Sequence, residues 1–134
     1  MIFVDNSTFF AILDRDDDAH ALARQTWTAL LSADTPALLL TSSYVLVESF
    51  ALTQSRLGLD AVRALHEDIL PVVSVHWVLE QDHAAAVSAL LTANRRRLSL
   101  VDCGSFQIMR RLGVRQALAF DQHFAEHGFE LVQP

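Results

Sequence analysis

The chain has 134 residues, the length of one compact domain, and 51% of them are apolar, enough for a sizeable core. No apolar run reaches membrane-spanning length, and the N-terminus does not resemble a signal peptide. The single cysteine, Cys103, cannot form an internal disulfide, which fits a reducing compartment. We therefore expect a cytoplasmic protein without membrane contacts. The formal net charge of −6 argues against an indiscriminate nucleic-acid binder, because phosphate affinity comes mostly from Lys and Arg.

Short apolar runs alternate with helical patterns through the first half of the chain. The first run ends at Asp5, and Asn6 or Ser7 is placed to cap the helix that follows. The predicted elements are a strand at 1–4, a helix reaching Leu13, a helix at 20–32, a strand at 37–40, a helix at 44–57 and a helix from Leu59 to about Ile69. The apolar side of the helix at 20–32 consists of Leu22, Trp27, Leu30 and Leu31.

The second half continues the same alternation. The predicted elements are a strand at 72–75, a helix at 78–94, a helix capped by Ser99 and closed by Gly113, a strand at 116–120, a helical turn at 123–127 and a strand at 129–132. On the helix at 78–94, the residues spaced to face the core are Leu79, Val87, Leu90 and Leu91. Short apolar strands separated by helices predict an α/β fold, a parallel sheet of about five strands with helices on both faces, in one domain spanning 1–134.

Four acidic residues lie where a parallel sheet collects ligands. Asp5 and Asp121 each follow a strand, Asp102 is in a helical first turn behind its capping partner Ser99, and Glu48 lies about two helical turns after the second strand. If the strand order reverses between the first and fourth strands, the four carboxylates converge. Clustered carboxylates repel unless cations lie among them, and Mg²⁺ or Mn²⁺ prefers such ligands. The pattern therefore indicates a metal-dependent phosphoester site.

The four acidic segments together resemble those of PIN-domain ribonucleases, and more narrowly the toxins of VapBC toxin–antitoxin pairs. They are FVDNS at 3–7, YVLVE at 44–48, SLVDCGSF at 99–106 with Met109 and Arg110, and ALAFDQHF at 117–124 leading to Gly128 and Phe129. The resemblance runs over essentially the full length. It implies a Rossmann-like PIN domain, bound Mg²⁺ or Mn²⁺, and endonucleolytic cleavage of RNA by a metal-activated water that leaves 5′-phosphate and 3′-hydroxyl ends.

The same resemblance assigns roles to individual residues. The catalytic and metal-binding quartet would be Asp5, Glu48, Asp102 and Asp121. Ser7 matches the hydroxyl residue that supports the first Asp, and Ser105 is a further supporting residue. Asn6 departs from the family, which usually has Thr or Ser there; its amide can bond a carboxylate, and the change bears on the positioning of Asp5. The implied partners are a second copy of the chain and a VapB-type antitoxin, whose C-terminal segment would cross an apolar groove and push a basic side chain toward the acids.

The basic residues allow two interpretations. Arg95, Arg96 and Arg97 would either bind RNA phosphates or form a solvated helix end that suits the dipole, and the sequence weighs these equally. One of Arg110 and its neighbour Arg111 would point off the apolar face and reach the rim of the acidic site. His123 has two interpretations as well. It would contact RNA or water, or, in the simpler interpretation, it would be a solvated residue without a catalytic role.

Three other function classes fit a similar sheet. A phosphoacceptor receiver domain and a haloacid-dehalogenase-type phosphatase both use a lysine near the phosphoryl group, and this chain has no lysine. The phosphatase also needs an Asp two residues after the first, where Ser7 stands. An RNA-binding or scaffold protein on a catalytically weakened fold is the remaining alternative. The complete quartet argues against it, because an unused carboxylate cluster only destabilises a fold.

Overall fold

Strand β1 (Ile2–Val4) is the central strand of a five-stranded parallel sheet in the computed structural model, which describes residues 1–132. It pairs with β2 (Leu39–Ser42) on one side and with β4 (Gln116–Leu118) on the other. The edges are β3 (Val73–His76) beside β2 and β5 (Glu130–Leu131) beside β4, giving the order β3-β2-β1-β4-β5. The strand order therefore reverses between β1 and β4, and the predicted parallel sheet is confirmed.

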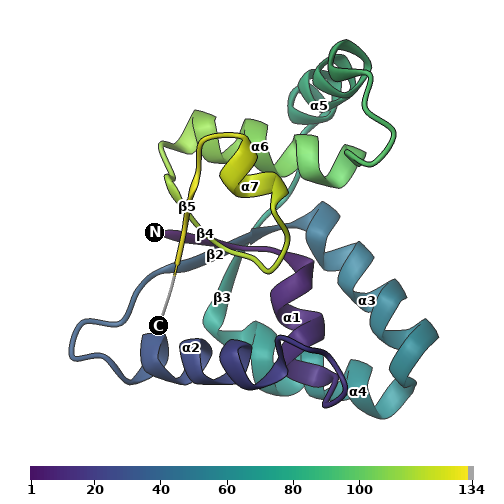
Figure 1. Cartoon of the computed structure of the whole chain (residues 1–134). Coiled ribbons are helices and arrows are strands. Elements are labelled where there is room, and N and C mark those ends of the chain that lie inside the picture. Colours follow the sequence, from purple (N-terminus) through teal and green to yellow (C-terminus); the bar gives the residue numbers. More distant parts are fainter. Residues whose placement is uncertain (133–134) are drawn as a thin grey trace.

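Helices cover both faces of this sheet, as predicted (Figure 1). One layer contains α1 (Asn6–Leu13), α2 (His20–Ser32), α3 (Ser43–Leu57) and α4 (Leu59–Ala64), and the other contains α5 (Glu80–Ala93), α6 (Leu100–Leu112) and α7 (His123–Glu126). A π-helical turn at Leu65–Ile69 and a 3₁₀ turn at Leu70–Val72 connect α4 to β3. Within residues 1–132 no helix combines the length and the apolar character needed to cross a bilayer.

The second strand lies two residues later than the sequence predicts. Thr41 and Ser42 belong to β2 although both are polar, and both are fully buried. Their hydroxyls are satisfied locally, because Thr41 Oγ1 donates to the carbonyl of Val4 at 2.8 Å and Ser42 Oγ accepts from the Val45 N–H at 3.2 Å. Ser42 thereby caps α3, which starts at the edge of the sheet where β1 also ends.

The predicted core faces of two helices are partly wrong. Leu91 is 73% exposed and Leu79 is 50% exposed, and α5 begins at Glu80 rather than at residue 78. The reason is that α5 packs mainly against α6, and it buries the smaller Asp82 and Ala86 in that contact. On α2, Leu22 and Leu31 were expected in the core but are exposed, whereas Trp27 is buried as expected.

Candidate metal centre

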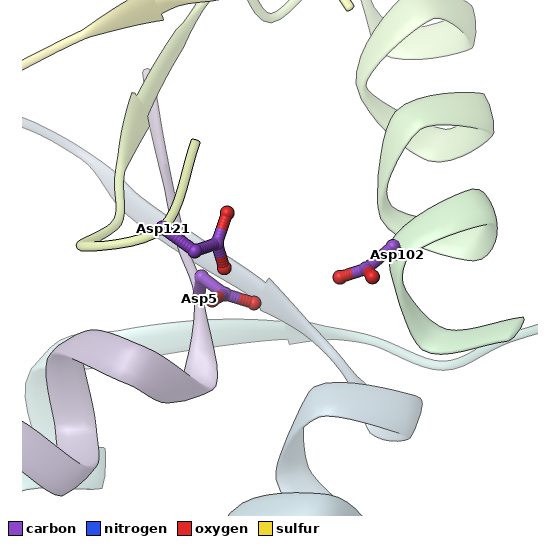
Figure 2. Close-up of side chains that lie close together, drawn as sticks. All are labelled: Asp5, Asp102 and Asp121. Atoms are coloured by element: carbon purple, nitrogen blue, oxygen red, sulfur yellow. The ribbon is translucent and has the colours of Figure 1, made fainter. Parts of the chain in front are cut away.

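Three of the four predicted acids meet at the carboxyl edge of the sheet. One oxygen from each of Asp5, Asp102 and Asp121 lies within 4.8 Å of the others. Figure 2 shows Asp5 and Asp121 side by side, with Asp102 reaching toward them from the first turn of α6. The reversal of strand order produces this meeting, because β1 and β4 are neighbours and both lead to an Asp at the same edge.

Asp5 is held by the start of α1. It is the N-cap of that helix, a place expected for Asn6 or Ser7, and its Oδ2 accepts from the Ser7 N–H at 3.2 Å and from Ser7 Oγ at 2.8 Å. Ser7 Oγ in turn accepts from the Phe120 N–H at 3.0 Å. One hydroxyl therefore connects the Asp5 carboxylate to the residue immediately before Asp121.

The other two acids are held by backbone amides. Asp102 Oδ2 accepts from the Ser99 N–H at 3.1 Å while Ser99 Oγ accepts from the Asp102 N–H at 3.0 Å, which confirms the predicted capping box. Asp121 Oδ1 accepts from the His123 N–H at 3.0 Å. Each of the three carboxylates keeps one oxygen that accepts no hydrogen bond from the described residues 1–132.

The electrostatics of this cluster are unfavourable without a cation. Asp5 is 1% exposed, and burial together with the charge of Asp121 raises its pKa to about 7, although the hydrogen bonds from Ser7 work in the opposite direction. Among residues 1–132 no arginine or histidine forms an ion pair with any of the three acids. Oxygen ligands with uncompensated negative charge are the donor set that Mg²⁺ and Mn²⁺ prefer, so the residues fit a divalent cation.

Glu48 lies beside the three aspartates but outside their group. Burial, followed by the charge of Asp102, raises the pKa of Glu48, and the Asn6 side-chain amide donates a hydrogen bond to Glu48 Oε1. The departure at Asn6 was expected to bear on the positioning of Asp5; instead the amide contacts Glu48, and Ser7 holds Asp5. The sequence could not show this contact, because it depends on how α3 packs beside α1.

Several other residues predicted for the site lie elsewhere. Ser105 is fully buried and its hydroxyl donates to the Val101 carbonyl of its own helix at 2.9 Å. Arg110, in the last turn of α6, donates to the His127 carbonyl at 3.2 Å and lies over the Phe129 ring. The expectation that Arg110 or its neighbour would reach the acidic rim is wrong, because both occupy the end of α6 opposite Asp102.

The remaining basic candidates lie nearer to the aspartates. Arg95 pairs with Glu126 of α7 at 3.5 Å, and the imidazole Nδ1 of His123 lies 3.8 Å from the same carboxylate. His123 is 25% exposed and its Nδ1 is buried, so it is not the freely solvated residue of the simpler reading. Arg96 and Arg97 are exposed in the turn between α5 and α6.

Sequence reasoning missed one polar cluster. Asp82 of α5, 5% exposed, pairs with Arg111 of α6 at 2.8 Å and with His76 at the end of β3 at 3.1 Å. Burial alone would raise the pKa of Asp82. The pKa is nevertheless lowered, because Asp82 accepts hydrogen bonds from His76 and the Leu79 N–H and lies beside the charge of Arg111. Arg111 lies 35 residues after His76 in the sequence, so no local pattern reveals the complete cluster.

Replacing Ser7 with Ala should weaken the metal centre. The change removes the hydroxyl bond that favours ionised Asp5 and leaves the Phe120 N–H unpartnered, so we expect a loss of about 1–3 kcal/mol in stability. We also expect Mn²⁺ to bind about 10–100-fold more weakly by calorimetry, the range typical of outer-shell partners. Ser105→Ala is the matched control, since it removes another buried hydroxyl and should leave Mn²⁺ affinity unchanged. Equal Mn²⁺ affinity in both variants would contradict this role of Ser7.

Comparisons with known proteins agree with the geometry. The PIN domain family model matches residues 2–130. The 23S rRNA-specific endonuclease VapC20 of Mycobacterium tuberculosis is 36% identical over 135 residues, covering 100% of this chain and 99% of the relative. The crystal structure of that VapC20, described as a sarcin–ricin loop cleaving toxin, superimposes with a TM-score of 0.88, 33% identity and full coverage of both chains.

A more distant structure supports the fold alone. FitAcB from Neisseria gonorrhoeae superimposes with a TM-score of 0.69 at 14% identity, covering 100% of this chain and 98% of the other. The family match spans nearly the whole chain, and the three aspartates that meet at the sheet edge come from segments inside that match. The chain therefore belongs to the PIN domain family.

Proposed function

We propose that this protein is a metal-dependent endoribonuclease, the toxin of a type II toxin–antitoxin pair. The observation that carries the proposal is the meeting of Asp5, Asp102 and Asp121 within 4.8 Å at the carboxyl edge of the sheet. The full-length similarity to a VapC endonuclease supports the same activity. A scaffold on a weakened fold is the poorer explanation, because ionised Asp5, buried beside Asp121, costs stability that a bound cation would offset.

Each residue of the site has a distinct task in this proposal. Asp5, Asp102 and Asp121 would hold Mg²⁺ or Mn²⁺ with their free oxygens, and Glu48 would complete the site from α3. A divalent cation held there supplies an activated water for attack on the phosphodiester and neutralises charge on the leaving oxygen. The Ser7 hydrogen bonds favour the ionised form of Asp5 and fix its carboxylate, and Asn6 orients Glu48. The products would carry 5′-phosphate and 3′-hydroxyl ends.

The substrate class follows from the relatives. VapC20 is described as a 23S rRNA-specific endonuclease and as a sarcin–ricin loop cleaving toxin. The 36% identity extends over the whole chain, so we propose that the large ribosomal RNA is the first substrate to test here. Transfer RNA and messenger RNA are the competing substrates that the same experiment distinguishes.

We also propose an antitoxin partner and a homodimer. An apolar groove of about 390 Å³ lies beside Glu48 and is lined by Tyr44, Val47, Ala51, Leu100 and Val101. An apolar antitoxin segment would fit there and bring a basic side chain to the acids, which suits the net charge of −6. Co-purification with the product of the neighbouring open reading frame tests the antitoxin, and light scattering tests the dimer.

Cleavage of RNA by the purified protein tests the proposed activity. Total RNA is incubated with the protein and Mn²⁺, Mg²⁺ or EDTA, and new 5′ ends are mapped by sequencing. We expect discrete ends in 23S rRNA with either metal and none with EDTA. The same ends in EDTA would show metal-independent cleavage, and no new ends from a folded, Mn²⁺-binding protein in any RNA would overturn the nuclease assignment.

A further inference from the structure

The turn between α5 and α6 has two exposed arginines, Arg96 and Arg97, at its centre. Asn94 ends α5 in a left-handed conformation, with φ at 51°, and its N–H donates to the Leu90 carbonyl at 3.1 Å. Leu98 is 4% exposed, and its N–H donates to the Arg95 carbonyl at 3.1 Å. This bond closes a tight turn in which Arg96 and Arg97 are the two central residues.

Most other arginines of the chain are engaged by neighbouring groups. Those with a partner among residues 1–132 are Arg56 over Phe10, Arg63 with Glu67, Arg95 with Glu126, Arg110 with the His127 carbonyl and Arg111 with Asp82. Arg96 and Arg97 form no ion pair or hydrogen bond with the described residues. Their guanidinium groups are therefore available to an external anion.

These two arginines lie in the turn that leads directly into the first turn of α6, which carries Asp102. Only Leu98 separates Arg97 from Ser99, so the Cα atoms of Arg97 and Ser99 are at most about 7 Å apart. The Ser99 N–H donates to the Asp102 carboxylate at 3.1 Å, and the Arg95–Glu126 pair attaches the same turn to α7, which follows Asp121. The other arginines without a described partner lie on different parts of the fold: Arg15 after α1, Arg24 on α2 and Arg115 before β4.

From these observations we infer that Arg96 and Arg97 bind the RNA backbone phosphates that flank the scissile bond. The acidic centre and the net charge of −6 repel RNA, so binding requires local positive charge. Guanidinium groups bind phosphate oxygens through two parallel hydrogen bonds. Arg95 has a different task, because its pairing with Glu126 fixes the turn between two elements of the site. The inference rests on the proposed function and specifies its substrate-binding surface.

A charge-matched pair of double variants tests this inference. The test variant is Arg96→Gln with Arg97→Gln, and the control is Arg15→Gln with Arg24→Gln, which removes the same charge from distant exposed positions. The probe is a synthetic RNA hairpin with the sarcin–ricin loop sequence of 23S rRNA. Binding is measured by fluorescence anisotropy in an Asp121→Asn background, which we expect not to cleave, and cleavage is measured with Mn²⁺ in the Asp121 form.

The test variant should bind the hairpin about tenfold more weakly, as expected for the loss of two exposed charge contacts. The slope of log K against log salt should fall in magnitude by about 1.4–1.8, or 0.7–0.9 per lost phosphate contact. In cleavage, KM should rise by a similar factor while kcat changes less than about twofold. Arg96→Lys with Arg97→Lys should restore the salt slope, because lysine keeps the charge, but only part of the affinity, because an ammonium group cannot form the two parallel hydrogen bonds.

Two results would overturn the inference. Equal losses in the test and control variants would show a nonspecific charge effect, and an unchanged salt slope in the test variant would show that no phosphate contact was lost. If the unmodified protein cleaves RNA in either case, the proposed function stands and this inference alone fails. If the unmodified protein neither binds nor cleaves RNA, the proposed function fails and the inference fails with it.

Discussion

Asp5→Asn should abolish RNA cleavage and at the same time stabilise the metal-free protein at pH 8. Loss of a metal ligand removes several kcal/mol of transition-state stabilisation, so we expect a decrease of about 10³-fold or more in rate. The substitution also removes a buried charge beside Asp121, while the amide oxygen still accepts from Ser7. We expect the midpoint of thermal unfolding in EDTA to rise by about 3–8 °C, equivalent to about 1–2 kcal/mol.

Asp82→Asn is the matched control for this prediction. Asp82 is a second buried acid, but Arg111 and His76 compensate its charge. Its replacement should lower stability by about 1–3 kcal/mol, a moderate cost because Arg111 is partly exposed, and should leave cleavage unchanged. If Asp5→Asn instead cleaves at the rate of the unmodified protein, or if both variants lose stability alike, Asp5 is not an uncompensated metal ligand.

Stability should depend strongly on pH without metal and only weakly with metal. Between 3.8, the ordinary pKa of an Asp, and about 7, its value at Asp5, the folded chain binds more protons than the unfolded chain. In EDTA the free energy of unfolding should therefore rise as the pH falls from 8 to 5, by about 2–3 kcal/mol. The raised pKa of Glu48 acts in the same direction.

Mn²⁺ should flatten this trend, because the cation competes with protons for the same carboxylates and so stabilises the protein mainly at high pH. At about 100 times its dissociation constant, the metal should raise the unfolding midpoint at pH 8 by about 10 °C, and the increase should vanish near pH 5. Differential scanning calorimetry at several pH values checks both profiles. A midpoint in EDTA that falls as the pH is lowered from 8 to 5 would contradict the pKa assigned to Asp5.

The sequence predicts the parts of the fold that depend on local patterns. The central strand is a short apolar run, and the capping box of α6 needs only Ser99 and Asp102 three residues apart. The places of Asp5 and Asp121 follow from a general property of parallel sheets, since side chains at carboxyl strand ends meet where the order reverses. These features are sufficient to place three of the four acids together.

The errors concern packing between separate elements, which a local pattern does not specify. Leu79 and Leu91 are exposed because α5 rests on α6 instead of the sheet, and periodicity does not say which element a helix meets. Arg110 faces His127 and Phe129, which reach it only through the return of the chain after β4. The contact between Asn6 and Glu48 likewise requires the orientation of α3 beside α1, which neither segment encodes alone.

The most direct test of the metal centre is anomalous X-ray diffraction from crystals of the protein grown with Mn²⁺. We predict a peak between Asp5, Asp102 and Asp121, with one oxygen of each at about 2.0–2.2 Å, near the distances usual for small divalent cations. The peak should disappear in crystals of Asp121→Asn grown in the same way. A protein that cleaves RNA with Mn²⁺ but shows no peak among these three carboxylates would contradict the account.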